Sequence, residues 1–301
     1  MLIADAPIDA PLVASSLEGE AVMARAAGEN FPVASRVLPR RVRAHLLAVY
    51  GFARLVDELG DSEEIAPADR LPALDWLEDE LDRVFRGEAT HPLLVRLQAT
   101  VRECGLPREP FARLIEANRV DQRVARYRTW EQLRGYCALS ADPVGELVLG
   151  IFGLATPARI ALSSSICTAL QLAEHCQDVA EDLARGRVYL PLEDLERFGC
   201  AEAELERDHA GSALREVLSF EVDRARGLLD EGAPLIGQLR GRPRLAVAAF
   251  VAGGRSALDA VERARYDVLA GPPRAGRTSR VLALAATLRA GGGARGRSAA
   301  P

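Results

Sequence analysis

The sequence contains no lysine, although it is rich in basic residues. All 38 basic residues of the 301-residue chain are arginine. The absence of lysine excludes Schiff-base chemistry, which needs a lysine amine. It also excludes a P-loop, whose phosphate-binding lysine would be missing. Two common kinds of active site are therefore ruled out before any motif is considered.

Cysteine is scarce, and the five cysteines are scattered. No two of them have C-x-x-C spacing, which argues against a zinc site and against a thioredoxin-like redox site. An odd, scattered set is typical of reduced thiols in a cytosolic protein. The five are Cys104, Cys137, Cys167, Cys176 and Cys200.

Signals for export, membrane insertion and nucleic-acid binding are also lacking. Residues 1–9 carry two aspartates and no basic residue, so they do not resemble the start of a secretory signal. No apolar run reaches the length of a transmembrane helix. The net charge of -5 argues against a nucleic-acid partner. We therefore predict a cytoplasmic protein whose only membrane contact would be peripheral, at the inner face.

Helical periodicity dominates the chain, and strand-like alternation is nearly absent. Most prolines fall between the helical stretches. The pattern predicts an all-α, single-domain helical bundle over residues 1–270, of which 1 to about 15 form a leader that can be disordered. Residues 271–301 form a basic tail with six arginines and no acid. The predicted helices cover residues 17–28, 40–60, 71–86, 91–103, 109–125, 130–152, 157–184, 202–231, 243–268 and 278–290.

Two of these helices combine an apolar composition with carboxylates. Residues 45–61 are apolar on nearly all sides, as is typical of a buried helix. Buried carboxylates cost several kcal/mol unless they are paired or bound to a metal. The second such helix, residues 166–182, ends in the acidic residues Asp178, Glu181 and Asp182.

The spacing of the aspartates predicts a magnesium site. Asp57 and Asp61 are four residues apart, as are Asp178 and Asp182. Residues at this spacing share one helix face, about 5–6 Å apart at Cβ, where two like charges repel. Mg²⁺ prefers oxygen ligands and often bridges carboxylates to substrate phosphates. Two such helices facing each other would clamp a metal-bound diphosphate; the alternative is that the carboxylates are merely solvated.

Several segments, in order along the chain, resemble the squalene/phytoene synthase family. They include Asn30-Phe-Pro-Val-Ala-Ser, Tyr136-Cys-Ala-Leu-Ser-Ala-Asp-Pro and Leu170-Gln-Leu-Ala-Glu-His-Cys-Gln-Asp. The resemblance spans residues 24 to 270 and implies a helical class I isoprenoid synthase that depends on Mg²⁺. Within the family, the opening segment is most similar to the hydroxysqualene synthases of bacterial hopanoid pathways.

The resemblance also implies roles for individual residues. Asp57, Asp61, Asp178 and Asp182 match the two metal-binding pairs of the family. Arg54 and Arg187 match arginines that contact the diphosphate. The positions that match residues lining the family's central cavity are Tyr50, Tyr136, Gln171 and Tyr189.

The sequence departs from the family pattern near the second pair. Glu174 stands where many members have a metal-binding asparagine, and a glutamate there could still bind Mg²⁺. Gln177 stands where some members have a phosphate-binding arginine, and an amide cannot neutralise a phosphate. His175 lies beside this motif, either as a proton shuttle or as a residue that supports the site. The number of metal ions is therefore left open.

The reaction that the resemblance implies is the ionisation of presqualene diphosphate, followed by rearrangement of the cation and capture by water to give hydroxysqualene. The alternatives are head-to-head joining of two prenyl diphosphates to squalene or phytoene, and an inactive family member that acts as an assembly factor. The expected partners are the isoprenoid diphosphate and neighbouring enzymes of the squalene or hopanoid pathway. The basic tail leaves peripheral membrane association open.

Overall fold

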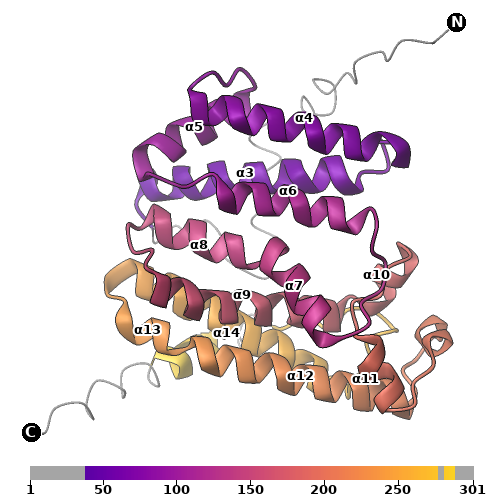
Figure 1. The fold of residues 1–301 in the computed structure, drawn as a ribbon. Helices are drawn as coiled ribbons and strands as arrows, with labels where there is room; N and C mark the ends of the chain where they lie inside the picture. Colours follow the sequence, from indigo (N-terminus) through magenta and orange to yellow (C-terminus); the bar gives the residue numbers. More distant parts are fainter. Residues whose placement is uncertain (1–37, 277–280, 289–301) are drawn as a thin grey trace, which may run out of the picture. The chain divides into compact units, whose positions relative to one another are not determined.

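The computed structural model describes residues 38–276 and 281–288. These residues are helical apart from turns, loops and one isolated β-bridge between Arg126 and Val188 (Figure 1). The prediction of an all-α fold is therefore confirmed. Contacts between residues gather into two compact units, whose described parts are residues 38–123 and residues 124–276 with 281–288. The predicted domain limits at residues 15 and 270 stay predictions.

The first unit consists of four helices. Prolines occupy the first turns of three of them, where the missing N–H group costs nothing. Gly87 and Gly105 end two helices in the left-handed conformation that glycine adopts most easily. The four helices are α3 (Arg40–Asp61), α4 (Pro67–Arg86), α5 (Pro92–Cys104) and α6 (Glu109–Asp121).

Helix α3 is the core of this unit, as its apolar composition predicts. It packs against α4, α5 and α6. Phe52 is fully buried, and its ring meets that of Phe111 edge to face at 5.2 Å between centroids. Ten of the 22 residues of α3 are buried, so the acidic end of this helix is held on a well-packed support.

The second unit is built around α9 (Pro157–Gln177), which packs against most of the unit's other helices. Thr156 caps its N-terminus by accepting a hydrogen bond from the Arg159 amide, and Pro157 opens its first turn. The helices in contact with α9 include α7 (Trp130–Ser140), α8 (Asp142–Ile151), α12 (Ser212–Gly232), α13 (Pro234–Gln238) and α14 (Gly241–Arg263). The shorter elements are α10 (Val179–Ala184), α11 (Leu192–Arg197) and η1 (Glu202–Glu206).

Three predicted helices are interrupted. The stretch 130–152 breaks at Ala141, because Pro143 fits the first turn of a new helix and not the middle of an old one. The stretch 157–184 breaks at Asp178. The stretch 202–231 becomes a 3₁₀ turn, a loop and then α12.

The first predicted helix, 17–28, lies outside the described residues. At the other end, residues 281–288 form a helix. Arg244 donates to the Leu288 carbonyl at 3.2 Å, and Arg255 donates to the Thr287 hydroxyl at 3.4 Å. These contacts attach part of the predicted tail to α14.

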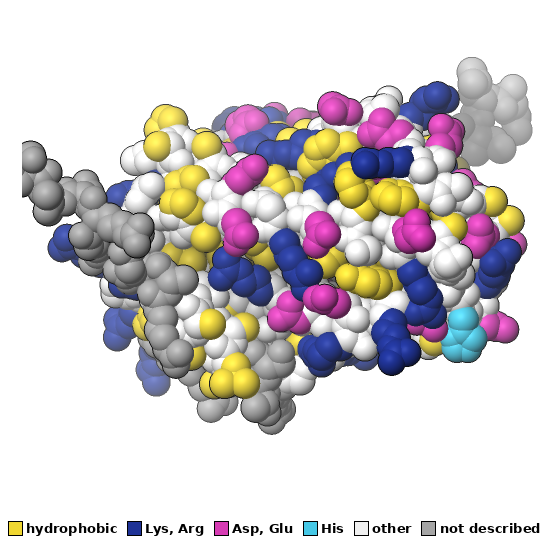
Figure 2. Space-filling model, turned by 90° about the horizontal axis from the view of Figure 1, so that it is seen from below, with side chains coloured by type: hydrophobic (Ala, Val, Ile, Leu, Met, Phe, Trp, Pro, Cys, Tyr) yellow, Lys and Arg dark blue, Asp and Glu magenta, His cyan; other side chains and the backbone are white. Residues whose placement is uncertain are grey.

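Surface charges are largely balanced within the second unit. Arg226 pairs with Asp259 at 3.0 Å and also with Glu262, and Arg255 pairs with Asp230 at 2.7 Å. Figure 2 shows basic and acidic side chains interspersed on one face of the molecule. Within the described ranges, no helix is both long and apolar enough to cross a membrane.

Candidate active site

The first acidic pair stands near the end of α3. Asp57 and Asp61 are both solvent-accessible, although the helix turns between and before them are buried. Arg54 lies one turn before Asp57 and approaches Glu58 at 3.8 Å. Tyr50 lies a further turn before Arg54 and is half-buried. One helix thus carries all four residues of the first predicted motif at intervals of about one turn.

The surroundings of Asp57 favour its protonated form. Desolvation by the surrounding protein raises its pKa to about 7, although part of the side chain still reaches solvent. The Arg54 charge and a hydrogen bond from Asn118 lower the pKa, while the negative charges of Asp61 and Asp121 raise it. This carboxyl therefore lacks a sufficient positive neighbour, which is the condition that a bound cation would relieve.

Helix α6 reaches the first pair through Asn118. Its amide donates to Asp57 Oδ1 at 3.5 Å, and its side chain is buried against α3. The contact requires Gly60, because a Cβ there would lie 2.1 Å from Asn118 Oδ1. Gln122 adds a second link by donating to the Gly60 carbonyl at 3.0 Å. The sequence patterns did not predict a role for Asn118; Gly60, beside Asp61, was the local signal for it.

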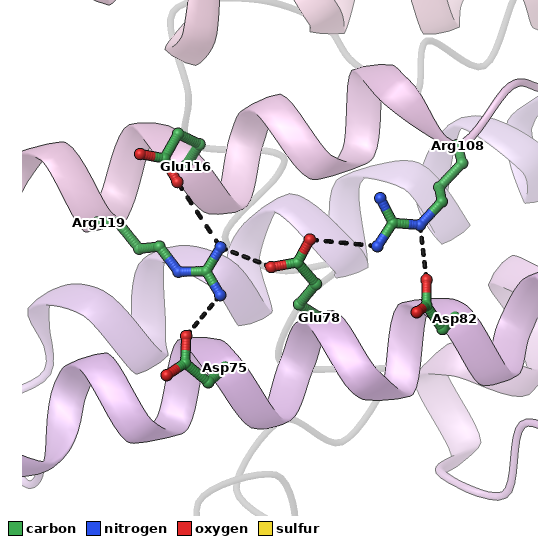
Figure 3. A network of polar contacts seen from close by, with 6 residues as sticks. All are labelled: Asp75, Glu78, Asp82, Arg108, Glu116 and Arg119. Carbon is green, nitrogen blue, oxygen red and sulfur yellow. Dashed lines mark hydrogen bonds and ion pairs between the residues drawn. The ribbon is translucent and has the colours of Figure 1, made fainter.

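An ion-pair network holds α6 against α4 (Figure 3). Arg119 bonds to Glu78 and Asp75, each at 2.6 Å. Arg108 bonds to Asp82 at 2.6 Å and to Glu78 at 3.2 Å. Arg119 follows Asn118 directly, so the network fixes the helix that supplies the Asp57 contact.

The second acidic pair lies at a helix break. Asp178 ends α9 and precedes α10, with φ -103° and ψ 19°. The Asp182 amide still donates to the Asp178 carbonyl at 2.8 Å, so the two residues remain one turn apart. Glu174 lies one turn before Asp178 on α9 and is half-buried. The structure therefore brings these three carboxylates onto consecutive turns.

Like charges and desolvation act on Asp178 as they do on Asp57. Desolvation raises its pKa to about 6, with Glu181 and Asp182 adding to the rise. His175 and Arg274 lower it. Arg274 belongs to the segment after residue 270, which the sequence gave no reason to place here. Gln177 explains the placement: it is buried and donates to the Pro273 carbonyl.

An aromatic cluster lies beside the second pair. Tyr127, Tyr136, Tyr189 and His175 are all buried. The rings of Tyr127 and Tyr189 stack at 5.8 Å, and Tyr136 lies 5.5 Å from Tyr189. His175 stacks on Tyr189 at 4.0 Å with 13° between the planes. The predicted cavity residues Tyr136 and Tyr189 are therefore in contact; Tyr127 was not predicted.

The backbone after α10 sets the position of Tyr189. Gly186 takes a left-handed conformation with φ 78°, which turns the chain back after the helix. Val188 then donates to the Ala125 carbonyl at 2.9 Å, beside the single β-bridge. Arg187 precedes this bridge and is half-buried. The turn thus places Tyr189 alongside Tyr127.

The donor sets fit magnesium as a cofactor shared with a substrate. Among residues 38–276 and 281–288, no group of three His, Cys, Asp or Glu side chains is arranged to hold a metal ion by itself. Mg²⁺ often binds through only one or two carboxylates and completes its octahedron with water and phosphate oxygens. Each unit carries two aspartates one helix turn apart, of which one, Asp57 or Asp178, is desolvated, and this matches that requirement. The convergence of the two pairs on one ligand stays a prediction.

Comparisons with known proteins agree with these features. The squalene/phytoene synthase family model matches residues 24–281. A hydroxysqualene synthase of Rhodopseudomonas palustris is 36% identical over 213 residues, which cover 70% of this chain and 72% of that protein. A phytoene synthase of Mycobacterium tuberculosis is 34% identical over 232 residues, 75% of each chain.

Solved structures agree as well. The crystal structure of squalene synthase HpnC from Alicyclobacillus acidocaldarius has a TM-score of 0.76 and 46% identity, covering 89% of this chain and 98% of that one. A dehydrosqualene synthase in complex with ligand has a TM-score of 0.80 at 23% identity, covering 94% and 97%, and supports the fold. The chain is an enzyme of the squalene/phytoene synthase family.

Proposed function

We propose that this enzyme converts presqualene diphosphate to hydroxysqualene with Mg²⁺ as its cofactor. The observation that carries the proposal is the second unit's acidic pair beside an aromatic cluster, with His175 in contact with both Asp182 and Tyr189. The acidic pair would bind the charged leaving group through the metal, and the adjacent aromatic cluster would accommodate a carbocation. The similarity to a hydroxysqualene synthase at 36% identity supports the choice of reaction.

The carboxylates would hold the metal. Asp57, Asp61, Asp178 and Asp182 are the proposed ligands, and Glu174 is a further candidate one turn before Asp178. When bound, Mg²⁺ neutralises the charge that develops on the departing diphosphate. Arg54 and Arg187 are the proposed contacts of the diphosphate oxygens, since arginine matches phosphate geometry well.

The aromatic cluster would stabilise the cation. The C–O bond of presqualene diphosphate breaks, diphosphate takes the electron pair, and the carbon skeleton rearranges as a cation. Aromatic faces attract cations, by about 2 kcal/mol or more where water is excluded. Tyr136 and Tyr189 are the proposed sources of such faces, and both are buried; His175 covers one face of Tyr189. Their burial also keeps bulk water from ending the reaction early.

One water must still reach the cation. Its oxygen forms the new C–O bond, and its proton passes to solvent or to the released diphosphate. Gln171 is half-buried and lies one turn before His175 on α9. Its polar side chain is therefore accessible to a water molecule. Tyr50 in the first unit is the other proposed polar contact. We assign water positioning to these residues.

A product assay tests the proposal. The purified full chain is incubated with MgCl₂ and, separately, presqualene, farnesyl or geranylgeranyl diphosphate, with and without NADPH. We expect an alcohol from presqualene diphosphate that does not depend on NADPH and that carries ¹⁸O from labelled water. Excess EDTA should abolish turnover, and re-added Mg²⁺ should restore it. Full turnover in EDTA would contradict the metal requirement.

A head-to-head prenyl synthase is the second candidate. The 34% identity to a phytoene synthase over three quarters of the chain favours it nearly as much. The same assay separates the two functions. Phytoene from geranylgeranyl diphosphate would replace our proposal with that activity. A hydrocarbon that forms from presqualene diphosphate only with NADPH would replace it with squalene synthesis.

We also propose that the enzyme works at the inner membrane face, where its lipid product would partition. Val281 and Leu282 are 67% and 66% exposed within a segment that contains no acid. Exposed apolar side chains with nearby basic residues favour anionic lipid surfaces. The variant Val281→Ser/Leu282→Ser should bind anionic vesicles less well than wild type. Val95→Ser, at a 43% exposed valine of the first unit, is the control.

A further inference from the structure

His175 lies where three residues of the proposed site meet. It is 7% exposed and stacks on the ring of Tyr189. Its Nε2 lies 3.3 Å from the amide nitrogen of Gln171, and its Nδ1 lies 3.7 Å from Asp182 Oδ2. A small pocket is lined by His175, Asp182 and Tyr189 together. One imidazole therefore contacts a proposed metal ligand, a proposed cavity wall and a proposed water-positioning residue.

The two polar contacts fit one tautomer of a neutral imidazole. A neutral ring donates from one nitrogen and accepts at the other. The Gln171 amide nitrogen can only donate, so Nε2 of His175 accepts from it. The ring hydrogen then lies on Nδ1, the nitrogen that faces the Asp182 carboxylate. In this arrangement each ring nitrogen of His175 faces a group of complementary polarity.

The stack on Tyr189 fixes the plane of the ring. A planar contact at 4.0 Å prevents the imidazole from turning about its outer bond without losing the contact. Both nitrogens are thereby aimed in set directions. Because the Gln171 amide nitrogen is engaged by the ring, its carbonyl oxygen is the atom left to accept a hydrogen bond from water.

We propose that His175 is a positioning residue that orients Asp182 toward the metal and Gln171 toward the attacking water. This inference rests on the proposed function. Through Asp182 it sets metal affinity, in the way that outer contacts of metal ligands do. Through Gln171 it sets how often the cation ends as an alcohol and how often it ends as a hydrocarbon by proton loss. His175 itself touches no reacting atom.

Three substitutions separate these effects. His175→Phe keeps an aromatic ring for the stack and removes both nitrogens. In His175→Asn the amide nitrogen takes the place of Nδ1, so the Asp182 contact remains. In His175→Gln the longer amide reaches the place of Nε2, so the Gln171 contact remains. The control is His209→Phe, since His209 belongs to a separate exposed pair with Asp267 at 3.0 Å.

Two readouts are measured for each full-length variant. Mn²⁺ affinity by electron paramagnetic resonance reports on Asp182, and the ratio of alcohol to hydrocarbon from presqualene diphosphate reports on Gln171. We expect His175→Phe to weaken Mn²⁺ binding by about 10-fold and to lower the alcohol fraction. His175→Asn should restore the affinity only, and His175→Gln should restore the product ratio only. His209→Phe should change neither.

Specific outcomes would overturn the inference. If His175→Phe matches wild type in both readouts, the histidine only fills space. If that variant does not fold, the Asn and Gln variants still test the inference. Equal Mn²⁺ affinities and equal product ratios in these two variants would show that the two ring nitrogens do not serve separate partners. Different results would contradict the proposed function itself: Mn²⁺ binding unchanged in Asp182→Asn, or no alcohol formed by wild type.

Discussion

The two acidic pairs stand in different surroundings. Asp57 lies on an unbroken helix and is approached by polar groups, the Arg54 charge and the Asn118 amide. Asp178 lies at a helix break, and its partner Asp182 lies beside a histidine that stacks in an aromatic cluster. Both aspartates nevertheless have raised pKa values, about 7 and about 6. Both frameworks thus contain an aspartate with a raised pKa, which the proposed Mg²⁺ would lower.

The two units also hold their aspartates in place by different means. The first unit fixes its aspartates through a buried helix and an ion-pair network on α4 and α6. In the second unit, the helix break at Asp178 lies beside stacked aromatic rings, and the turn at Gly186 positions one of these rings. A diphosphate needs only firm ligands, whereas a cation needs apolar walls. The aromatic framework therefore marks the second unit as the proposed place for the carbon skeleton.

The largest expected effect comes from removing one carboxylate from each pair. Asp57→Asn and Asp178→Asn should each lower turnover by at least about 100-fold, the scale of losing one key electrostatic group. The fold should survive both changes. The Asn118 amide can still donate to the side-chain carbonyl of an asparagine at position 57, and the Asp178 side chain makes no capping hydrogen bond to α10 that an asparagine would lose.

Steady-state rates and melting curves measure both variants. A near-normal rate with an unchanged melting curve would show that the substituted aspartate is not a metal ligand. If only one variant loses activity, the two pairs do not have equivalent roles.

Asn118→Ala tests the polar framework alone. The loss of its hydrogen bond should raise the pKa of Asp57 further, because that bond lowers it. Fewer carboxylates would then be ionised near neutral pH, and Mn²⁺ binding should weaken by about 10-fold. Thr100→Ala is the control, since Thr100 is a buried polar residue of the same unit that bonds to His45 at 3.0 Å. Equal Mn²⁺ affinities in both variants would remove Asn118 from the site.

Glu221→Gln tests a buried acid of the second unit that the proposed reaction does not use. Burial raises the pKa of Glu221 to about 8, and it contacts Arg224, which also bonds to Asp194 at 2.8 Å. Since the folded pKa exceeds the ordinary value of 4.5, the native state keeps a proton that the unfolded chain loses. Stability should therefore fall as the pH rises from about 4.5 to about 8.

The glutamine variant should flatten that slope, because it cannot ionise. Urea unfolding of both proteins at several pH values between 5 and 9 measures it. Identical slopes in wild type and variant would mean that Glu221 is ionised in the folded protein.

The smallest expected effect comes from the network in Figure 3. Arg119→Met removes its bonds to Glu78 and Asp75, of which Asp75 is mostly exposed. Such partly exposed pairs contribute about 1 kcal/mol or less. We expect the variant to unfold with a slightly lower free energy than wild type. Added salt should reduce this difference, because it screens the ion pairs of the wild type. A loss of stability well above that contribution would show that the network stabilises more of the first unit than the contact between α4 and α6.

Much of the fold follows from sequence pattern. The helix 40–60 is found as α3, and 91–103 is found as α5 within one residue at each end. The pattern failed where two helices meet without a polar loop, at Ala141 and at Asp178. Periodicity continues through such a break, so the break leaves no gap in the pattern. The short helices α11 and α13 were missed because five or six residues show hardly two turns of periodicity.

The site is predicted less completely, because its supporting contacts join distant parts of the chain. The carboxylates were found from their spacing and from the family resemblance, and their roles stay predictions. The bond from Asn118 to Asp57 spans 61 residues, and no local pattern announces it. The stack of His175 on Tyr189 depends on the turn at Gly186, which sequence analysis did not interpret.

The burial of the cysteines has a practical consequence for handling the enzyme. Burial raises the pKa of Cys137 and of Cys167 to about 12, and that of Cys176 well above its ordinary value. Few thiolates exist at neutral pH, and the thiolate is the form that oxidants and alkylating reagents attack. Since the chain also lacks lysine, a cysteine introduced on the surface would react ahead of these three thiols, whereas Cys104 is a half-buried free thiol and would be replaced first. Spin labels or fluorophores could then be attached at one chosen position of a variant that lacks only Cys104.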